Sequence, residues 1–163
     1  MQVRRARPAD AAAIAEAHVR SWQQAYEHVF GAEKLEALNT EARTRLAEQA
    51  IAEADVAVAE DDEGGVVGFA YVRESRDVEG EGELWAIYCV AEAWGTGAGT
   101  ALMDWAKEAL RRRRDVATLW VLEDNPRARR FYEREGWTLD GEAKTDRFLG
   151  VDVGEVRYRL RLR

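Results

Sequence analysis

The stretch from Glu83 to Leu110 constrains the fold of this chain more than any other part of the sequence. It begins as a strand-like run, LWAIYCV at 84–90, passes through the glycine-rich loop GTGAG at 95–99, and resumes as a helix-like run ending at Leu110. A glycine loop between a strand and a helix leaves backbone amides without partners at the positive end of the helix dipole. The stretch therefore predicts an anion site of the kind that binds phosphate groups.

The composition indicates one globular domain covering residues 1–163. Hydrophobic residues make up 47% of the sequence and charged residues 34%, a balance typical of folded rather than disordered chains. No apolar run approaches the roughly 18 residues that cross a bilayer, and the basic N-terminus lacks the apolar segment of a signal peptide. The single cysteine, Cys89, cannot form an internal disulfide and fits a reducing compartment. We expect a cytoplasmic protein that does not bind membranes.

The charge pattern narrows the choice of partners. The net charge of −7 argues against nucleic acid, because phosphate contacts need a basic face. The two histidines, His18 and His28, form no metal-ligand cluster of recognisable spacing, so no metal is expected. Acidic residues gather at 53–63 and 74–83. They form either a solvated surface or an edge that suits a cationic substrate.

The first half of the chain predicts a short strand, three helices and a hairpin. Residues 2–6 suit a strand, and Pro8 with Asp10 suits the start of a helix that carries Trp22 and Tyr26 on one face. Further elements are expected as a short helix at 35–38, a helix at 40–51, and hairpin strands at 56–59 and 66–72 around an acidic turn.

The second half predicts a buried strand, a capped helix and a final strand. Residues 116–122, VATLWVL, are almost continuously apolar, as in a parallel strand covered on both faces. Asn125 and Pro126 are a helix cap and a first helical residue, and Gly136 ends that helix. The remaining elements are expected as a strand at 137–139, a polar loop at 141–154 and an alternating strand at 156–162. Together these elements predict a single α/β (α+β) domain with a mixed sheet of about seven strands and about four helices.

Two familiar nucleotide-binding motifs do not fit the glycine loop. A P-loop needs Lys followed by Ser or Thr after its last glycine, and here Gly99 is followed by Thr100 and Ala101. A Rossmann fingerprint that starts at Gly95 and Gly97 would need a third glycine where Thr100 stands. The loop alone does not identify its ligand.

A resemblance to a known family draws on more of the chain. The segment IYCVAEAWGTGAG at 87–99 resembles motif A of the GNAT superfamily of N-acetyltransferases, whose loop reads Arg/Gln-x-x-Gly-x-Gly/Ala. The segment NPRARRFYEREGW at 125–137 resembles its motif B, Asn-x-x-Ala-x-x-Phe-Tyr-x-x-x-Gly-Phe. Trp94 departs from the pattern, because the family usually has Arg or Gln there. That loop binds pyrophosphate mainly through backbone amides, so binding is expected to survive, with Trp94 packing instead.

The resemblance implies a GNAT-like fold and acetyl-CoA as co-substrate, without a metal. In such a fold the central parallel strands splay around the CoA site. The end of the first of them, Cys89 and Val90, would pair with pantetheine, and Asn125 would bond the same arm. Arg129 or Arg130 could meet the phosphates, although a solvated arginine explains each equally well. The amides expected to hold the pyrophosphate are those of Gly95, Thr96, Gly97, Ala98, Gly99 and Thr100.

The implied reaction is transfer of an acetyl group to an amine by direct attack in a ternary complex, and two residues are candidates for its proton transfers. Tyr132 could protonate the departing thiolate, because a phenol with a pKa of about 10 stays protonated at neutral pH. The alternative is a core tyrosine beside Phe131. Glu83 matches the position of a glutamate that often takes the amine proton in this family, through water, and Glu81 or a water chain could substitute. The alternative for Glu83 is a solvent-facing strand end in an acidic loop. Cys89 as a nucleophile is disfavoured because no histidine has a recognisable placement to activate it.

The acceptor amine is open: a small molecule, or a peptide N-terminus or lysine. Trp22, Tyr26 and Trp85 are the candidate substrate-binding residues, since Trp and Tyr tolerate a wet edge; core packing of Trp22 and Tyr26 is the alternative. A CoA-binding module or sensor with little catalysis, and an unrelated nucleotide-binding enzyme, are the rival functions. Family members are often dimers, so a homodimer stays open.

Overall fold

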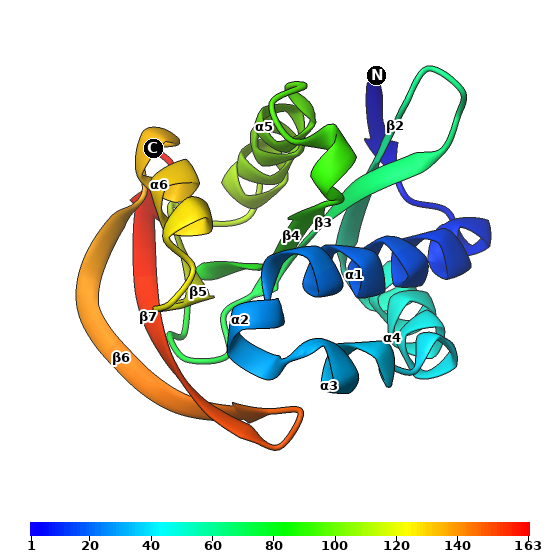
Figure 1. The fold of residues 1–163 in the computed structure, drawn as a ribbon. Coiled ribbons are helices and arrows are strands. Elements are labelled where there is room, and N and C mark those ends of the chain that lie inside the picture. The colour runs from blue at the N-terminus through cyan, green and yellow to red at the C-terminus, as the bar shows by residue number, and fades with distance from the viewer.

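A seven-stranded sheet with the order β1-β2-β3-β4-β5-β7-β6 runs through the computed structural model, which describes residues 1–163 (Figure 1). Only β4 and β5 are parallel neighbours, and every other adjacent pair is antiparallel. The mixed sheet predicted from the sequence is confirmed. The strands are β1 (Gln2–Arg5), β2 (Asp55–Glu60), β3 (Val66–Glu74), β4 (Gly82–Cys89), β5 (Val116–Leu122), β6 (Thr138–Phe148) and β7 (Val151–Arg161).

The two parallel strands separate soon after they meet. They pair only at Gly82 with Ala117 and at Glu83 with Thr118. Beyond this point β4 continues alongside β3, whereas β5 continues alongside β7. The rest of β4 therefore has a free backbone edge that faces β5, at the centre of the sheet.

The sheet is covered by helices on both faces. His18 on α1 contacts Phe69 of β3, whereas the neighbouring Gly68 faces Leu102 of α5. Because successive strand residues point to opposite faces, α1 and α5 lie on opposite sides of the sheet. The helices are α1 (Ala11–Ala25), α2 (Glu27–Phe30), α3 (Ala32–Glu36), α4 (Thr40–Glu53), α5 (Ala98–Arg111) and α6 (Pro126–Arg134), with single 3-10 turns at Pro8–Asp10 and Ala91–Ala93.

There are six α-helices rather than about four, because two short helices, α2 and α3, follow α1. The chain changes direction at Gly31, whose φ of 81° is open to glycine, so α2 and α3 form separately on either side of it. The expected start of α6 is confirmed: Asn125 caps it through a bond from the Ala128 amide, and Pro126 is its first residue.

The polar loop predicted at 141–154 is wrong. These residues belong to the long β6–β7 hairpin, whose two-residue turn is Leu149 and Gly150, both with positive φ. The polar composition indicated a loop, but both strands carry charged side chains that pair across the hairpin, as Arg147 does with Asp152 at 2.9 Å. The hairpin curves away from the sheet beside α2 and α3 (Figure 1).

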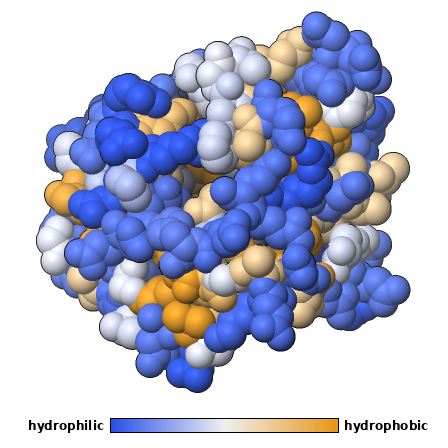
Figure 2. Space-filling view, in the orientation of Figure 1, coloured by the Kyte–Doolittle hydropathy of each residue, from blue (hydrophilic) through white to orange (hydrophobic).

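The hydrophobic core has two parts. The larger lies between the sheet and the helices, and the smaller joins Trp22, Tyr26, Phe30 and Leu35 to Leu122 and Val153. No helix combines the length and apolar character required to cross a membrane. The face in Figure 2 is mostly hydrophilic and is hollowed near its middle.

Candidate active site

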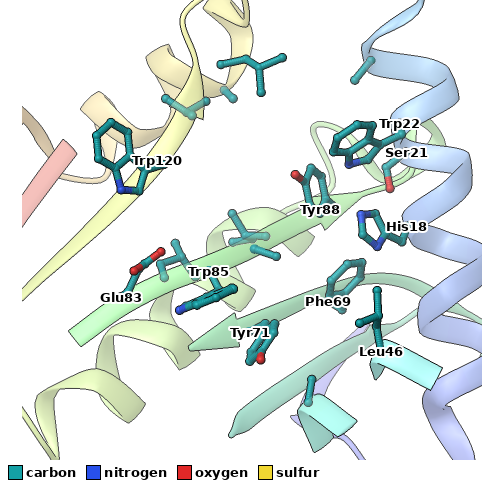
Figure 3. Close-up of a pocket in the computed structure, with 18 of the residues that line it drawn as sticks. His18, Ser21, Trp22, Leu46, Phe69, Tyr71, Glu83, Trp85, Tyr88 and Trp120 are labelled. Atoms are coloured by element: carbon teal, nitrogen blue, oxygen red, sulfur yellow. The ribbon is translucent and has the colours of Figure 1, made fainter. Parts of the chain in front are cut away.

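A cavity of about 540 Å³ lies between α1 and the sheet, where β4 and β5 separate. Its floor is formed by β3, β4 and β5; α4 and the β6–β7 hairpin complete the wall, and its far end reaches Asn125 and Tyr132 at α6. This volume is typical of a site for a small ligand. Figure 3 shows the side chains of α1 facing those of β3 and β4 across this space.

Aromatic rings form the α1 side of the cavity. His18 stacks on Tyr88 with 5.3 Å between ring centroids, and Trp22 packs edge-on against Tyr26 at 5.0 Å. Trp22 and Tyr26 are buried, and both also line the cavity. The two interpretations of these residues therefore do not exclude each other: they are core residues whose rings reach the cavity.

The glycine loop leaves four amides unused. The N–H groups of Gly95, Gly97, Gly99 and Thr100 donate to no protein acceptor. The amides of Thr96 and Ala98 are engaged, with the Ala93 carbonyl at 3.3 Å and the Thr96 hydroxyl at 3.4 Å.

Space beside the loop is open as well. Gly95 and Gly97 have φ of 75° and 92°, and nothing lies within 4 Å of where a Cβ would stand on either. Free amides, open space and the start of a 14-residue helix are the features of a phosphate site. The loop therefore has the free donors and the open space that a phosphate group needs.

The free edge of β4 faces the gap between the parallel strands. The Val90 amide donates to the Val67 carbonyl at 2.9 Å, so Val90 is bonded to β3. Because backbone groups alternate in direction along an antiparallel pair, those of Ile87 and Cys89 point the opposite way, toward β5. For an extended ligand in this gap, Ile87 offers both backbone groups and Val90 offers neither. Cys89 offers only its amide, because its carbonyl already accepts from Trp94.

Trp94 occupies a defined position at the end of this edge. Its indole N–H donates to the Cys89 carbonyl at 3.0 Å, and the Arg127 guanidinium stacks on its ring at 3.5 Å. Trp94, which departs from the family pattern, therefore packs within the protein as expected. Burial raises the pKa of the Cys89 thiol to about 11, so this thiol is protonated at neutral pH and is a weak nucleophile.

Tyr132 reaches the cavity from α6. Its ring is buried beside Phe131 and Tyr158, yet its hydroxyl forms no hydrogen bond within the protein and is not sealed from the cavity. Burial raises the pKa of Tyr132 well above its ordinary value of 10, with smaller contributions from Tyr88 and Cys89. The phenol therefore stays protonated at all physiological pH values and can donate into the cavity.

Glu83 lies at the opposite end of the cavity, at the last point where β4 and β5 pair (Figure 3). Only 1% of the residue is exposed, and its carboxylate accepts from the Arg76 amide at 3.1 Å and the Arg76 guanidinium at 2.7 Å. The alternative prediction of a solvent-facing strand end is wrong, because the loop at 74–82 covers it. Glu81, the substitute candidate, is bonded to Arg159 and does not line the cavity.

Trp85 stands beside Glu83 on the cavity wall. Arg76 and Arg73 lie over its ring at 3.6 and 4.2 Å, and its indole N–H is buried without a partner. The half-buried residue lines the cavity, so a ligand there can contact its side chain. The prediction that Trp85 contacts the acceptor keeps a physical basis.

Asn125 and Arg129 are both engaged within the protein. Besides capping α6, Asn125 donates from Nδ2 to the Tyr26 hydroxyl at 3.0 Å, which connects α1 to α6. Arg129 donates to the Tyr158 hydroxyl at 3.1 Å and to the Glu123 carbonyl at 3.2 Å, and it does not line the cavity. Arg127, two residues earlier on the helix, does line it.

Sequence reasoning missed several cavity residues. His18, Arg43, Tyr88 and Glu155 were not singled out as site residues, and all four line the cavity. His18 could have been found, because it precedes Trp22 by four residues and therefore shares its helix face. Arg43 and Glu155 had no such signal, since α4 and the hairpin are placed only by the tertiary fold.

Comparisons with known proteins agree on one family. The sequence model of the acetyltransferase (GNAT) family matches residues 13–137. An uncharacterised N-acetyltransferase of Bacillus subtilis, YuaI, is 36% identical over 128 residues, covering 76% of this chain and 73% of the relative.

Solved structures share the fold along the whole chain. The yncA protein of Salmonella typhimurium, solved with acetyl-CoA, has a TM-score of 0.77 at 21% identity, over 100% of this chain and 94% of that one. The PaiA N-acetyltransferase of Thermoplasma acidophilum, solved with coenzyme A, has a TM-score of 0.79 at 17% identity, over 98% of each chain.

Proposed function

Because the chain belongs to the acetyltransferase (GNAT) family, whose reaction uses acetyl-CoA, we propose that it acetylates a primary amine by direct attack in a ternary complex. The proposal takes residues 1–163 as one catalytic domain. The observation that carries it is a cavity lined by a protonated phenol at one end and a buried carboxylate at the other, with the free amides of the glycine loop following Trp94 of its lining.

Bound acetyl-CoA supplies the activated acetyl group. In our proposal the amides of Gly95, Gly97, Gly99 and Thr100 bind its pyrophosphate, since they are the loop donors that no protein group uses. Arg127 lies beside Trp94 at the same end of the cavity and adds positive charge there. The free backbone groups of Ile87 and the free amide of Cys89 orient the pantetheine arm as a strand would.

Tyr132 and Glu83 then divide the proton transfers. The amine nitrogen forms a bond to the acetyl carbon while the carbon–sulfur bond breaks, so one proton must leave nitrogen and one must reach sulfur. Tyr132 gives its proton to the departing sulfur, whose thiol has an ordinary pKa of about 8.5. Glu83 accepts the amine proton through water, because its carboxylate is held by Arg76 at the cavity wall. The new proton on Glu83 and the lost proton on Tyr132 return through solvent.

Thiol release measures this function directly. The purified protein is incubated with acetyl-CoA and a panel of primary amines, and free CoA is followed with a thiol reagent. We expect amine-dependent release, and a double variant, Glu83→Gln with Tyr132→Phe, is the matched inactive control. A protein that binds acetyl-CoA, seen as a raised melting temperature, yet releases CoA with none of the amines, would be a binding module and would refute the proposal.

A further inference from the structure

Arg43 of α4 lines the cavity, and its side-chain cation has no partner. The guanidinium forms no hydrogen bond and no ion pair within the protein, and its Nε is buried with nothing to accept from it. Burial lowers the pKa of Arg43 from 12.5, but an arginine remains charged at neutral pH. A half-buried guanidinium without an acceptor is destabilising, so it marks a position where an anion from outside the protein is favoured.

The groups around Arg43 supply no negative charge. Arg43 faces the stacked rings of His18 and Tyr88. Burial, with a contribution from Arg43 itself, lowers the pKa of His18 to about 4, and burial raises that of Tyr88. Both rings are therefore neutral at pH 7.

The buried carboxylates of the cavity already have cationic partners. Glu83 pairs with Arg76 at 2.7 Å, and Glu155 lies 4.0 Å from Lys144. The other carboxylates that line the cavity, Glu53 and Asp146, are exposed. The cavity is therefore short of buried negative charge on the side of α4.

We propose that Arg43 binds the carboxylate of the acceptor, and that the acceptor is a free amino acid with an apolar side chain. This inference rests on the proposed acetyl transfer and specifies its substrate. The guanidinium offers paired N–H donors that match a carboxylate. The amine would then lie toward the gap between β4 and β5, and the side chain would contact apolar surface.

The walls and the charge of the cavity favour this class over a polyamine. Trp22, Phe69, Tyr71 and Trp85 line it with aromatic surface, which an apolar side chain can cover. A polyamine would bring further positive charge to a cavity that already holds Arg43 and Arg73, neither of which has a carboxylate partner. The acidic stretches that suggested a cationic substrate are largely paired elsewhere, as Asp55 is with arginines.

The test compares amines that differ only in the carboxylate. Leucine and phenylalanine are each assayed against their amides and their decarboxylated amines, with spermidine as the polyamine. The variants are Arg43→Met, Arg43→Lys and the control Arg45→Met, which removes an exposed arginine from the same helix. For wild type we expect kcat/KM for the amino acids to exceed that for the matched amines by about tenfold or more, the value of a charged hydrogen bond.

The variants assign that preference to Arg43. Arg43→Met should lose it mainly through a raised KM for the amino acids, so that kcat/KM for each amino acid approaches that for its decarboxylated amine. Arg43→Lys should keep part of it, and Arg45→Met all of it. Equal kcat/KM with and without the carboxylate, or a preference for spermidine, would overturn the inference while leaving acetyl transfer intact.

Binding separates this inference from the function on which it rests. Titration calorimetry of leucine and of isoamylamine, each into the protein loaded with CoA, reports the carboxylate contact without turnover. If leucine binds and isoamylamine does not, and Arg43→Met no longer binds leucine, the carboxylate contact with Arg43 is supported even if no amine is acetylated. Equal binding of both compounds overturns it.

Discussion

The proposed general acid offers the sharpest test of the proposed mechanism, because Tyr132→Phe removes one hydroxyl and little else. That hydroxyl makes no hydrogen bond within the protein, and the ring contacts to Phe131 and Tyr158 remain in the variant. We therefore expect the free energy of unfolding to change by no more than about 0.5 kcal/mol. A change in activity would then report chemistry rather than folding.

The expected loss in kcat is tenfold or more. General acids typically contribute about 10²- to 10⁴-fold, and a thiol with a pKa of about 8.5 is already a moderate leaving group, which favours the lower end. A tenfold loss corresponds to about 1.4 kcal/mol of activation free energy. The rate of CoA release at saturating acetyl-CoA and amine, followed with a thiol reagent, measures kcat.

The pH dependence gives a second readout. Because burial raises the pKa of Tyr132 above its ordinary value of 10, wild type should not lose its acid between pH 6 and 9. The loss of kcat in Tyr132→Phe relative to wild type should become smaller above about pH 8.5, where a departing thiolate needs no proton.

A neighbouring tyrosine supplies the matched control. Tyr158→Phe also removes one hydroxyl, but that hydroxyl is bonded to Arg129 and Glu133 and does not line the cavity. This control should lower stability and preserve kcat. If Tyr132→Phe retains the kcat of wild type, Tyr132 has no part in the proton transfer.

Three further changes test the carboxylate, a helix cap and an ion pair. Glu83→Gln should lower kcat by about tenfold or more and alter the ascending limb of the pH–rate profile; an unchanged limb and rate would exclude Glu83 as the base. Asn125→Ala removes the cap of α6 and the bond to Tyr26, and should cost about 1 kcal/mol in urea denaturation; an unchanged midpoint would contradict the role of the cap. Hydrogen bonds from Arg4 and the Arg7 amide lower the pKa of Asp10 from 3.8 to about 2. A lowered pKa means that the ionised form stabilises the fold, so this contribution is present above about pH 4 and is lost as the pH falls toward 2. Wild type should therefore lose stability over that range more steeply than Asp10→Asn, and parallel curves would argue against the ion pair.

Local signals predicted the glycine loop and the capped helix, the two features on which the proposed cofactor site rests. The glycine loop at 95–99 and the capped helix that begins at Asn125 are specified by residues adjacent in sequence, because a turn needs glycine at particular positions and a helix start needs a cap. Both are present in the structure where the sequence predicted them. The free amides follow from the same local geometry.

Local sequence signals were weaker where the role of a residue depends on which way its side chain points. On α6 the sequence did not distinguish the arginines, and only the packed helix shows that Arg127 faces the cavity while Arg129 is bonded to Tyr158. The polar residues at 141–154 predict a loop, because a strand pair with charged side chains on its exposed face lacks the apolar alternation that identifies strands.

The sequence by itself determined the family, the order of the elements and the glycine loop that we propose binds phosphate. Only the tertiary structure decided the proposed acceptor half, because its residues come from segments far apart in the chain. Arg43, His18, Tyr88 and Glu155 meet in one cavity when α1 and α4 pack on the sheet and the hairpin closes beside them. The cost of leaving Arg43 there without an anion is a property of burial, and burial is set by the whole fold.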